Sequence, residues 1–168
     1  MVEDCLMVMR RRKNIRLPPD CYRGWTLALI TICTKNKVPY FGFEGITECG
    51  IHTLSEVSAL EQFLVPVYCF MPDHVHLLIE SRSDESDVRR FVARFKQVSA
   101  YRIRKCRPAF AWQRNYHDRV LHTMNGWPNF ARYVLENPIR IGLVNDARDY
   151  PYSGSIGYSI DDIVEGLI

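Results

Sequence analysis

Apolar segments of two kinds alternate along the 168-residue chain, and their order predicts an α+β, ferredoxin-like fold. Runs rich in apolar and β-branched residues occupy positions 25–34, 64–70 and 74–80 and are typical of strands. Longer segments at about 46–63 and 87–106 favour helices. With a later strand and a last helix, the order β-α-β-β-α-β predicts an antiparallel sheet with helices on one face, plus a C-terminal helix. We expect the other sheet face to be free for binding.

The first three strands have clear ends in the sequence. Strand one ends at Lys35-Asn36-Lys37, and strands two and three are separated by the turn signal Met71-Pro72-Asp73, which predicts a hairpin. In the second helix, apolar side chains recur at helical spacing and predict the buried stripe, which Ser99 is small enough to join. The stripe consists of Val88, Phe91, Val92, Phe95, Val98 and Ile103.

The C-terminal third predicts one more strand and one more helix. The strand covers residues 111–122, and the helix begins at Trp127-Pro128, where proline suits the first turn. Pro138 should stop or kink that helix at Asn137, because a residue before proline disfavours helical geometry. The predicted organisation is a basic arm over 1–20, a single domain over 21–155 and a tail over 156–168.

Composition indicates an ordinary globular protein, with 47% apolar and 24% charged residues. No apolar run reaches the roughly 20 residues of a membrane helix, and no apolar signal-peptide core follows the basic N-terminus. We therefore expect a cytoplasmic protein. The six cysteines include no C-x-x-C pair and are expected to be free, mostly buried thiols.

Positive charge is concentrated in two segments, although the net charge is only +3. Between Arg89 and Arg119 there are ten Lys or Arg residues and one acid, Asp118. Such segregation favours a polyanion such as nucleic acid, although a solvated basic face has the same pattern. The candidate DNA-binding residues are Arg10, Arg11, Arg12, Lys13, Arg16, Arg89, Arg90, Arg94, Lys96, Arg104, Lys105 and Arg114.

Two histidines lie one residue apart in the third predicted strand. Side chains two apart in a strand share a face, so His74 and His76 should lie together and Val75, Leu77 and Ile79 should face the core. Paired imidazoles make half of a metal site. The alternative is a pair of structural histidines.

The last helix carries Tyr133 and Asn137 one turn apart, on one face. Tyr133 is a possible nucleophile and Asn137 a possible oxygen ligand. Two imidazoles with an amide oxygen suit Mg²⁺ or Mn²⁺ better than structural zinc. Alternatively, Tyr133 packs in the core and Asn137 caps the helix. Tyr116 and His117 are further candidates, and Trp112 and Trp127 are expected in the core rather than stacked on bases.

These motifs together resemble a known family. His74-Val75-His76 after Met71-Pro72-Asp73, with Tyr133-Val134-Leu135-Glu136-Asn137-Pro138 downstream, is similar to the single-tyrosine HUH transposases of insertion sequences. The chain resembles most the branch called REP-associated tyrosine transposases. Segments 31–37, 112–118 and 150–154 strengthen the resemblance, which extends from about residue 10 to 154.

The resemblance implies a metal-dependent single-stranded DNA endonuclease and strand transferase. It implies that His74 and His76 bind Mg²⁺ or Mn²⁺, with Asn137 where relatives commonly have glutamine. Tyr133 would attack the scissile phosphate, forming a 5′-phosphotyrosine and freeing a 3′-hydroxyl. The implied substrate is a DNA hairpin with a short guide sequence, a repetitive extragenic palindrome in this branch. Asp73 stands where the family often has asparagine.

Two matters stay open at this level. Insertion-sequence relatives form dimers, whereas members of the REP-associated branch need not, so a homodimer is possible. A non-catalytic or domesticated nucleic-acid-binding protein on the same, RRM-like fold is the alternative function. The sequence lacks the aromatic-rich R-G-F-x-F strand motif of RNA-recognition domains, which disfavours that alternative.

Overall fold

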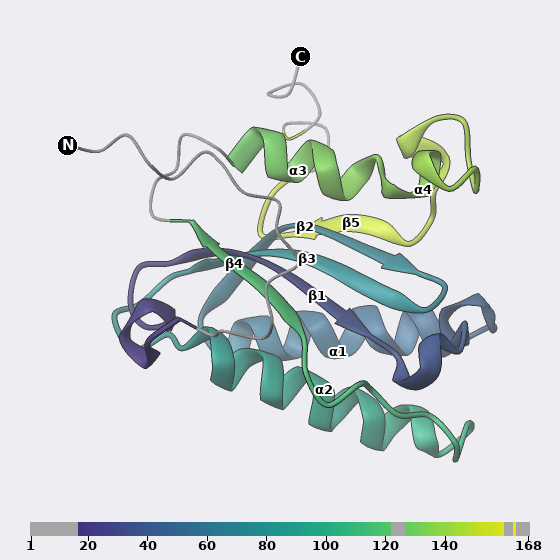
Figure 1. The fold of residues 1–168 in the computed structure, drawn as a ribbon, viewed down its shortest axis with the longest axis horizontal. Coiled ribbons are helices and arrows are strands. Elements are labelled where there is room, and N and C mark those ends of the chain that lie inside the picture. Colours follow the sequence, from purple (N-terminus) through teal and green to yellow (C-terminus); the bar gives the residue numbers. More distant parts are fainter. Residues whose placement is uncertain (1–16, 122–126, 160–162, 164–168) are drawn as a thin grey trace.

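A five-stranded antiparallel sheet lies between two helical layers (Figure 1). The structure is a computed structural model that describes residues 17–121, 127–159 and 163. The strand order is β4-β1-β3-β2-β5, which confirms the predicted α+β fold and extends it by one strand. The strands are β1 (Leu27–Cys33), β2 (Phe63–Met71), β3 (His74–Ser81), β4 (His117–Leu121) and β5 (Ser153–Ile156).

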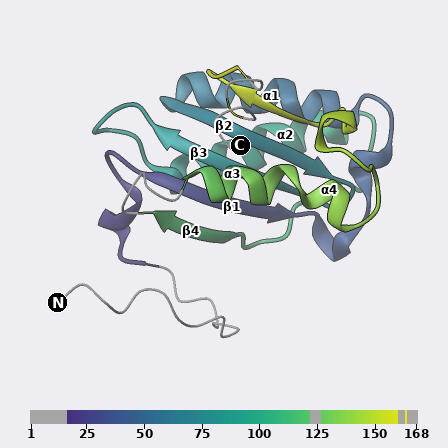
Figure 2. The same cartoon turned by 90° about the horizontal axis from the view of Figure 1, so that it is seen from above.

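Helices cover both faces of the sheet. Helices α1 (Ile46–Leu60) and α2 (Val88–Arg104) pack on one face, and α3 (Trp127–Leu135) crosses the other, followed by α4 (Asn137–Arg140) (Figures 1 and 2). The expectation of a free second face is therefore wrong. Apolar side chains of α3 bury that face, in a cluster that includes Leu27, Val67, Cys69, Met71, Leu78, Ala131, Val134 and Leu135.

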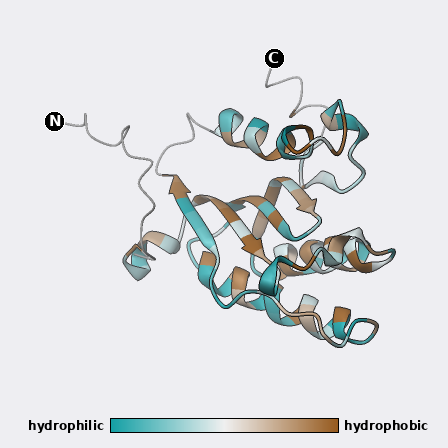
Figure 3. Ribbon diagram, turned by 45° about the vertical axis from the view of Figure 1, so that its right-hand side comes forward, coloured by the Kyte–Doolittle hydropathy of each residue, from teal (hydrophilic) through white to brown (hydrophobic). Residues whose placement is uncertain are grey.

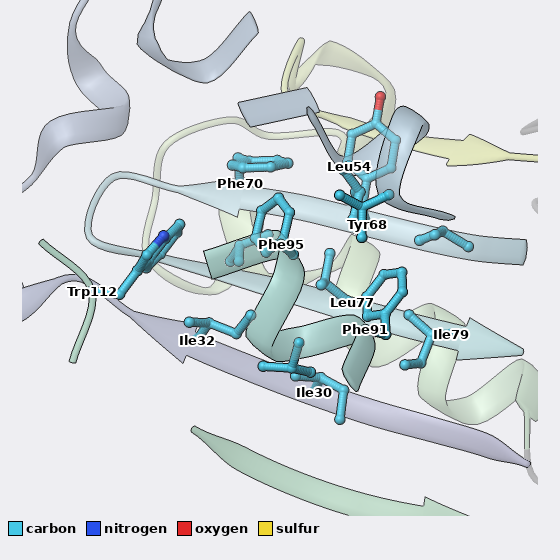
Figure 4. Packing of buried hydrophobic residues seen from close by; sticks show 14 of the residues in the cluster. Ile30, Ile32, Leu54, Tyr68, Phe70, Leu77, Ile79, Phe91, Phe95 and Trp112 are labelled. Atoms are coloured by element: carbon cyan, nitrogen blue, oxygen red, sulfur yellow. The ribbon is translucent and has the colours of Figure 1, made fainter. Parts of the chain in front are cut away.

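The main core lies between the sheet and the α1–α2 layer (Figure 4). As the alternation in β3 predicts, Val75, Leu77 and Ile79 are fully buried there. Phe91 and Phe95 of α2 meet them from the helical side. Burial of these apolar side chains stabilises the β2–β3 hairpin in one register. That register decides which side chains of β3 lie on the opposite face of the sheet.

The buried stripe of α2 differs from the prediction at one position. Val98 is only partly buried, whereas Ser99 is fully buried, so Val98 is not a core residue. The Ser99 hydroxyl donates to the Phe95 carbonyl and accepts from the Trp112 indole N–H, at 2.9 Å. Burying a hydroxyl costs little free energy when it is hydrogen-bonded, so Ser99 can lie on the buried face of the helix.

Strand ends are the least accurately predicted features. Trp25 is 72% exposed and lies outside β1, and the predicted strand over 111–122 is reduced to β4 and an isolated bridge between Thr34 and Trp112. Trp112 is buried, as predicted, and Trp127 is partly buried against the second cluster. Figure 3 shows β4 as largely hydrophilic, in keeping with a sheet edge.

Strand β5 was missed because its sequence, Ser-Gly-Ser-Ile, has little strand propensity. Its pairing with β2 depends on close approach: a Cβ at Gly154 would lie 2.5 Å from the Tyr68 hydroxyl. A larger residue at position 154 would therefore force the Tyr68 ring to move, because its Cζ would lie 2.7 Å from the added Cβ.

Short helical turns complete the described chain. They are the 3₁₀ turns η1 (Pro19–Tyr22), η2 (Lys35–Lys37), η3 (Tyr40–Gly42) and η5 (Ala147–Asp149). The five cysteines in the described ranges are free thiols, but of these only Cys69 is buried, contrary to expectation. Within the same ranges, no helix has the length and apolar content to span a membrane.

Candidate active site

The hairpin between β2 and β3 sets the position of the two histidines. In the sheet register, His76 pairs with Thr31 of β1 and Cys69 of β2, and His74 pairs with Cys33 and Met71. Because paired residues share a face, His74 and His76 lie on the side covered by α3. The predicted shared face is therefore present in the structure.

The two imidazoles meet through their ε nitrogens. Their ring centroids are 4.7 Å apart at 88°, and the two Nε2 atoms are 3.0 Å apart. At this separation one nitrogen donates a proton to the other, because two lone pairs would repel each other. These two nitrogens could hold a cation only if this proton were lost.

Each δ nitrogen has its own partner. His74 Nδ1 donates to Asp73 Oδ1 at 2.5 Å, and His76 Nδ1 is hydrogen-bonded to Thr31 Oγ1 at 3.0 Å. Such bonds fix the ring orientation and direct the opposite nitrogen toward a ligand. Both ε nitrogens are thereby aimed at one point.

His76 is 5% exposed, and its environment favours the neutral ring. Burial, together with electrostatic interactions with His74 and Arg140, lowers the pKa of His76 to about 3. A neutral imidazole retains the lone pair that metal binding requires.

Tyr133 lies directly beside this pair. Its ring meets the His76 ring edge-to-face, with centroids 5.7 Å apart at 83°. The residue remains 39% exposed, so substrate can reach it, unlike a tyrosine packed in the core. The Arg140 guanidinium lies over the same ring, 4.8 Å from its centroid.

Asn137 is turned toward its own helix. Its amide nitrogen donates to the Tyr133 carbonyl at 2.6 Å and to the Val134 carbonyl at 3.4 Å. In this conformation Asn137 caps the end of α3, as one of the two sequence interpretations expected. The structure thus brings together His74, His76 and Tyr133, and shows Asn137 one turn away in a capping role.

The sheet separates the two remaining candidates near β4. Tyr116 packs against the core on the α1–α2 side. His117 pairs with Thr31 in the sheet and is exposed, on the same side as His76. His117 is therefore the one of the two that shares a face with the histidine pair.

The predicted basic residues of α2 lie on the opposite side of the sheet from Tyr133 (Figure 1). Arg89 pairs with Asp87, and Arg90 and Arg94 both pair with Glu61, a buried carboxylate. Lys96 donates to the Gln113 and Arg114 carbonyls, and Arg104 donates to the Phe110 carbonyl. The Lys105 ammonium lies over the Tyr101 ring. The predicted Arg10, Arg11, Arg12, Lys13 and Arg16 lie outside the described residues.

Two side chains of this site were not found from the sequence. Thr31 is 45 residues from His76 in the chain, and only the strand register joins them. Arg140 lies seven residues after Tyr133, which is two helical turns, and this spacing was a usable signal. Among the described residues, no three of His, Cys, Asp and Glu gather into a metal-binding group.

Family comparison defines the class to which this fold and site belong. Residues 27–135 match a family model described as "Transposase IS200 like", a span from β1 to the end of α3 that contains the histidine pair and Tyr133. The protein is thus of the transposase class. It belongs to the IS200-like family of transposases.

Individual relatives are distant. A protein of Haemophilus influenzae provisionally named a REP-associated tyrosine transposase is 25% identical over 96 residues, covering 51% of this chain and 54% of that protein. The REP-associated tyrosine transposase of Escherichia coli K12 is 20% identical over 102 residues, covering 61% and 60%. This chain thus matches little more than half the length of these relatives.

One solved structure has the same fold over nearly the whole chain. It is a REP-associated tyrosine transposase bound to a REP hairpin, with a TM-score of 0.70 and 18% identity. The match covers 96% of this chain and 88% of that one. The likeness confirms the α+β fold with its five-stranded sheet and helices.

Proposed function

We propose that this protein is a metal-dependent endonuclease and strand transferase that cuts single-stranded DNA at hairpins through a covalent 5′-phosphotyrosine. The observation that carries the proposal is the packing of the partly exposed Tyr133 against His76, whose Nε2 meets that of His74. The ring centroids of Tyr133 and His76 are 5.7 Å apart and those of His76 and His74 are 4.7 Å apart, so a phenol and two imidazoles lie together. Such convergence is what covalent phosphoryl transfer requires.

The proposed reaction is a phosphoryl transfer to the phenol. Tyr133 Oη attacks the scissile phosphorus, the bond from phosphorus to the 3′-oxygen breaks, and DNA is released with a free 3′-hydroxyl. The phenol loses its proton to solvent, and the departing oxygen gains one. Attack by a 3′-hydroxyl on the phosphotyrosine reverses these bonds and joins the strands, which restores Tyr133.

The donor set fits a divalent cation. His74 and His76 would hold Mg²⁺ or Mn²⁺, and the Asn137 oxygen would be a third ligand. The amide nitrogen of Asn137 makes both hydrogen bonds to α3, so these bonds do not engage the amide oxygen. When bound, such a cation polarises a phosphate oxygen and stabilises developing negative charge. Asp73 and Thr31 orient the two rings toward it.

The DNA class is proposed from the relatives. A structural relative with the same fold binds a REP hairpin, and the charge pattern of this chain favours a polyanion. We propose hairpin DNA as the partner, held by the basic arm and by the basic residues of and near α2.

The test is formation of a covalent adduct on hairpin oligonucleotides taken from the DNA that flanks the coding region, with Mg²⁺ or Mn²⁺. The wild type should give a shifted band on a denaturing gel, and Tyr133→Phe should give none. His74→Ala with His76→Ala should abolish cleavage while leaving DNA binding largely intact, because phosphate binding and chemistry rest on different residues. An equally strong adduct with Tyr133→Phe would refute the assignment of Tyr133 as the nucleophile.

The capping conformation of Asn137 favours a second candidate, a non-catalytic nucleic-acid-binding protein. In that case the amide has a purely structural role. Tight hairpin binding without cleavage at every metal concentration, and with wild-type Tyr133, would favour this candidate.

A further inference from the structure

Arg140 follows Tyr133 on the same helical face, two turns later. The backbone N–H of Arg140 donates to the Glu136 carbonyl at 3.0 Å, so helical hydrogen bonding continues across the break between α3 and α4. Pro138 occupies the first turn of α4, where its missing N–H costs nothing. As a result, the Arg140 side chain lies over the Tyr133 ring. The distance from its guanidinium carbon to the ring centroid is 4.8 Å.

The guanidinium has an acidic partner and remains accessible. Its Nη2 donates to Glu136 Oε2 at 2.8 Å, and its side chain is 46% exposed. A guanidinium has five N–H donors, and its planar fork matches two oxygens of a phosphate. An exposed i,i+4 ion pair is weak, so a phosphate diester can replace Glu136 as the partner.

The position of Arg140 suits the charge that develops during phosphoryl transfer. The phosphorus must lie near Tyr133 Oη for attack, and the guanidinium is beside that ring, on a different element from the two histidines. We infer that Arg140 is a further catalytic residue, an inference that rests on the proposed function. When DNA binds, the Arg140 guanidinium exchanges its ion pair with Glu136 for hydrogen bonds to the non-bridging oxygens of the scissile phosphate. The bonds made and broken are those of the transfer to Tyr133, and Arg140 supplies hydrogen bonds only.

The first arm of the test measures adduct formation. Single-turnover rates are compared on a hairpin oligonucleotide whose cleaved phosphate has been mapped with the wild type. Arg140→Gln should slow the adduct by about 10²-fold, the usual effect of losing one transition-state donor, and Arg140→Lys should recover part of the rate. Arg132→Gln is the control, since it removes the same charge one residue before Tyr133. A wild-type rate for Arg140→Gln overturns the inference.

The second arm separates phosphate binding from mere support of the ring. Binding is measured in a Tyr133→Phe background, which keeps the ring and excludes cleavage, with a natural phosphate or a neutral methylphosphonate at the mapped position. Arg140→Gln should weaken binding of the natural oligonucleotide, and this weakening should largely disappear on the methylphosphonate. An equal weakening on both oligonucleotides means that Arg140 only supports Tyr133, and overturns the inference.

The two proposals fail differently. If the wild type forms no adduct, or Tyr133→Phe does, the proposed function fails first. If the wild type forms the adduct through Tyr133 and Arg140→Gln matches it, only the inference about Arg140 fails. Thermal melting of each variant checks that it folds, and Arg140→Lys keeps the positive charge if Arg140→Gln does not fold.

Discussion

At the scale of single residues, the histidine pair is organised by its neighbours rather than by its own sequence motif. Asp73 is adjacent to His74 in the chain, but Thr31 reaches His76 from another strand. Both contacts engage Nδ1, which leaves the two Nε2 atoms facing each other. The hydroxyl of Thr31 therefore acts on the candidate metal site through the orientation of His76.

Replacing Thr31 by valine removes this hydrogen bond and keeps the shape of the side chain. We expect the affinity for Mn²⁺ to fall about 10- to 100-fold, as is typical of losing a group that orients a ligand. Isothermal titration of the protein with Mn²⁺ measures the change. Ile32→Val is the matched control, since Ile32 faces the opposite layer of the same strand. Equal affinities of wild type and Thr31→Val would refute the orienting role.

At the scale of elements, the start of α2 depends on one buried carboxylate. Asp87 is the N-cap, and its side chain accepts from the backbone N–H groups of Arg89 and Arg90. Its carboxylate also pairs with the side chains of Arg89 and Arg23. Burial by itself raises the pKa of Asp87, but these hydrogen bonds outweigh it and lower the pKa to about 2.

A lowered carboxyl pKa makes this cap pH-dependent. Asp87→Ala should reduce the free energy of unfolding by about 1–2 kcal/mol at neutral pH. The contribution of Asp87 is present above its unfolded pKa of about 4. It is lost as pH falls toward its folded pKa of about 2. Denaturant unfolding at several pH values should therefore show wild type and variant converging across this window.

The control for this experiment is Asp84→Ala, at an exposed aspartate three residues earlier. It should change the stability little and uniformly with pH. A constant difference between wild type and Asp87→Ala from pH 7 to pH 2 would contradict the assigned cap.

At the scale of the whole molecule, the sheet separates the candidate active site from the basic helix α2. Tyr133 and the histidines lie on the α3 side, whereas α2 lies on the other. Part of the charge on α2 has an internal function, since Arg90 and Arg94 neutralise the buried Glu61. Lys105 and Tyr101 line an open groove of about 940 Å³ on α2, together with Arg94 and Arg104. DNA bound both there and at Tyr133 has to pass around an edge of the sheet.

This separation predicts that binding and cleavage respond to different variants. The double variant Lys105→Gln with Arg114→Gln should bind the hairpin more weakly. The slope of log affinity against log salt concentration should fall by about 0.7–0.9 for each phosphate that these side chains neutralise in the wild type. The adduct rate at saturating DNA should not change. Fluorescence anisotropy at several salt concentrations, with Arg82→Gln as an exposed control, measures the slope. An unchanged slope would exclude the α2 side from the DNA path.

Local pattern was sufficient for much of this protein. Alternation in β3 predicted which side chains face the core, and helical spacing predicted most of the α2 stripe, because both depend on short-range periodicity. The spacing of Tyr133 and Asn137 predicted a shared helical face in the same way. The fold class and the family followed from the order of these elements and motifs.

Tertiary structure decided what depends on distant partners. The cover of α3 over the second sheet face, the bond between Thr31 and His76, and the strand β5 with its glycine against Tyr68 all join residues far apart in the chain. No local propensity encodes such contacts, because they arise only when long-range burial and strand register bring the segments together. The amino-acid order determined which groups are available for chemistry, and the packing of α3 on the sheet decided that His76 and Tyr133 meet.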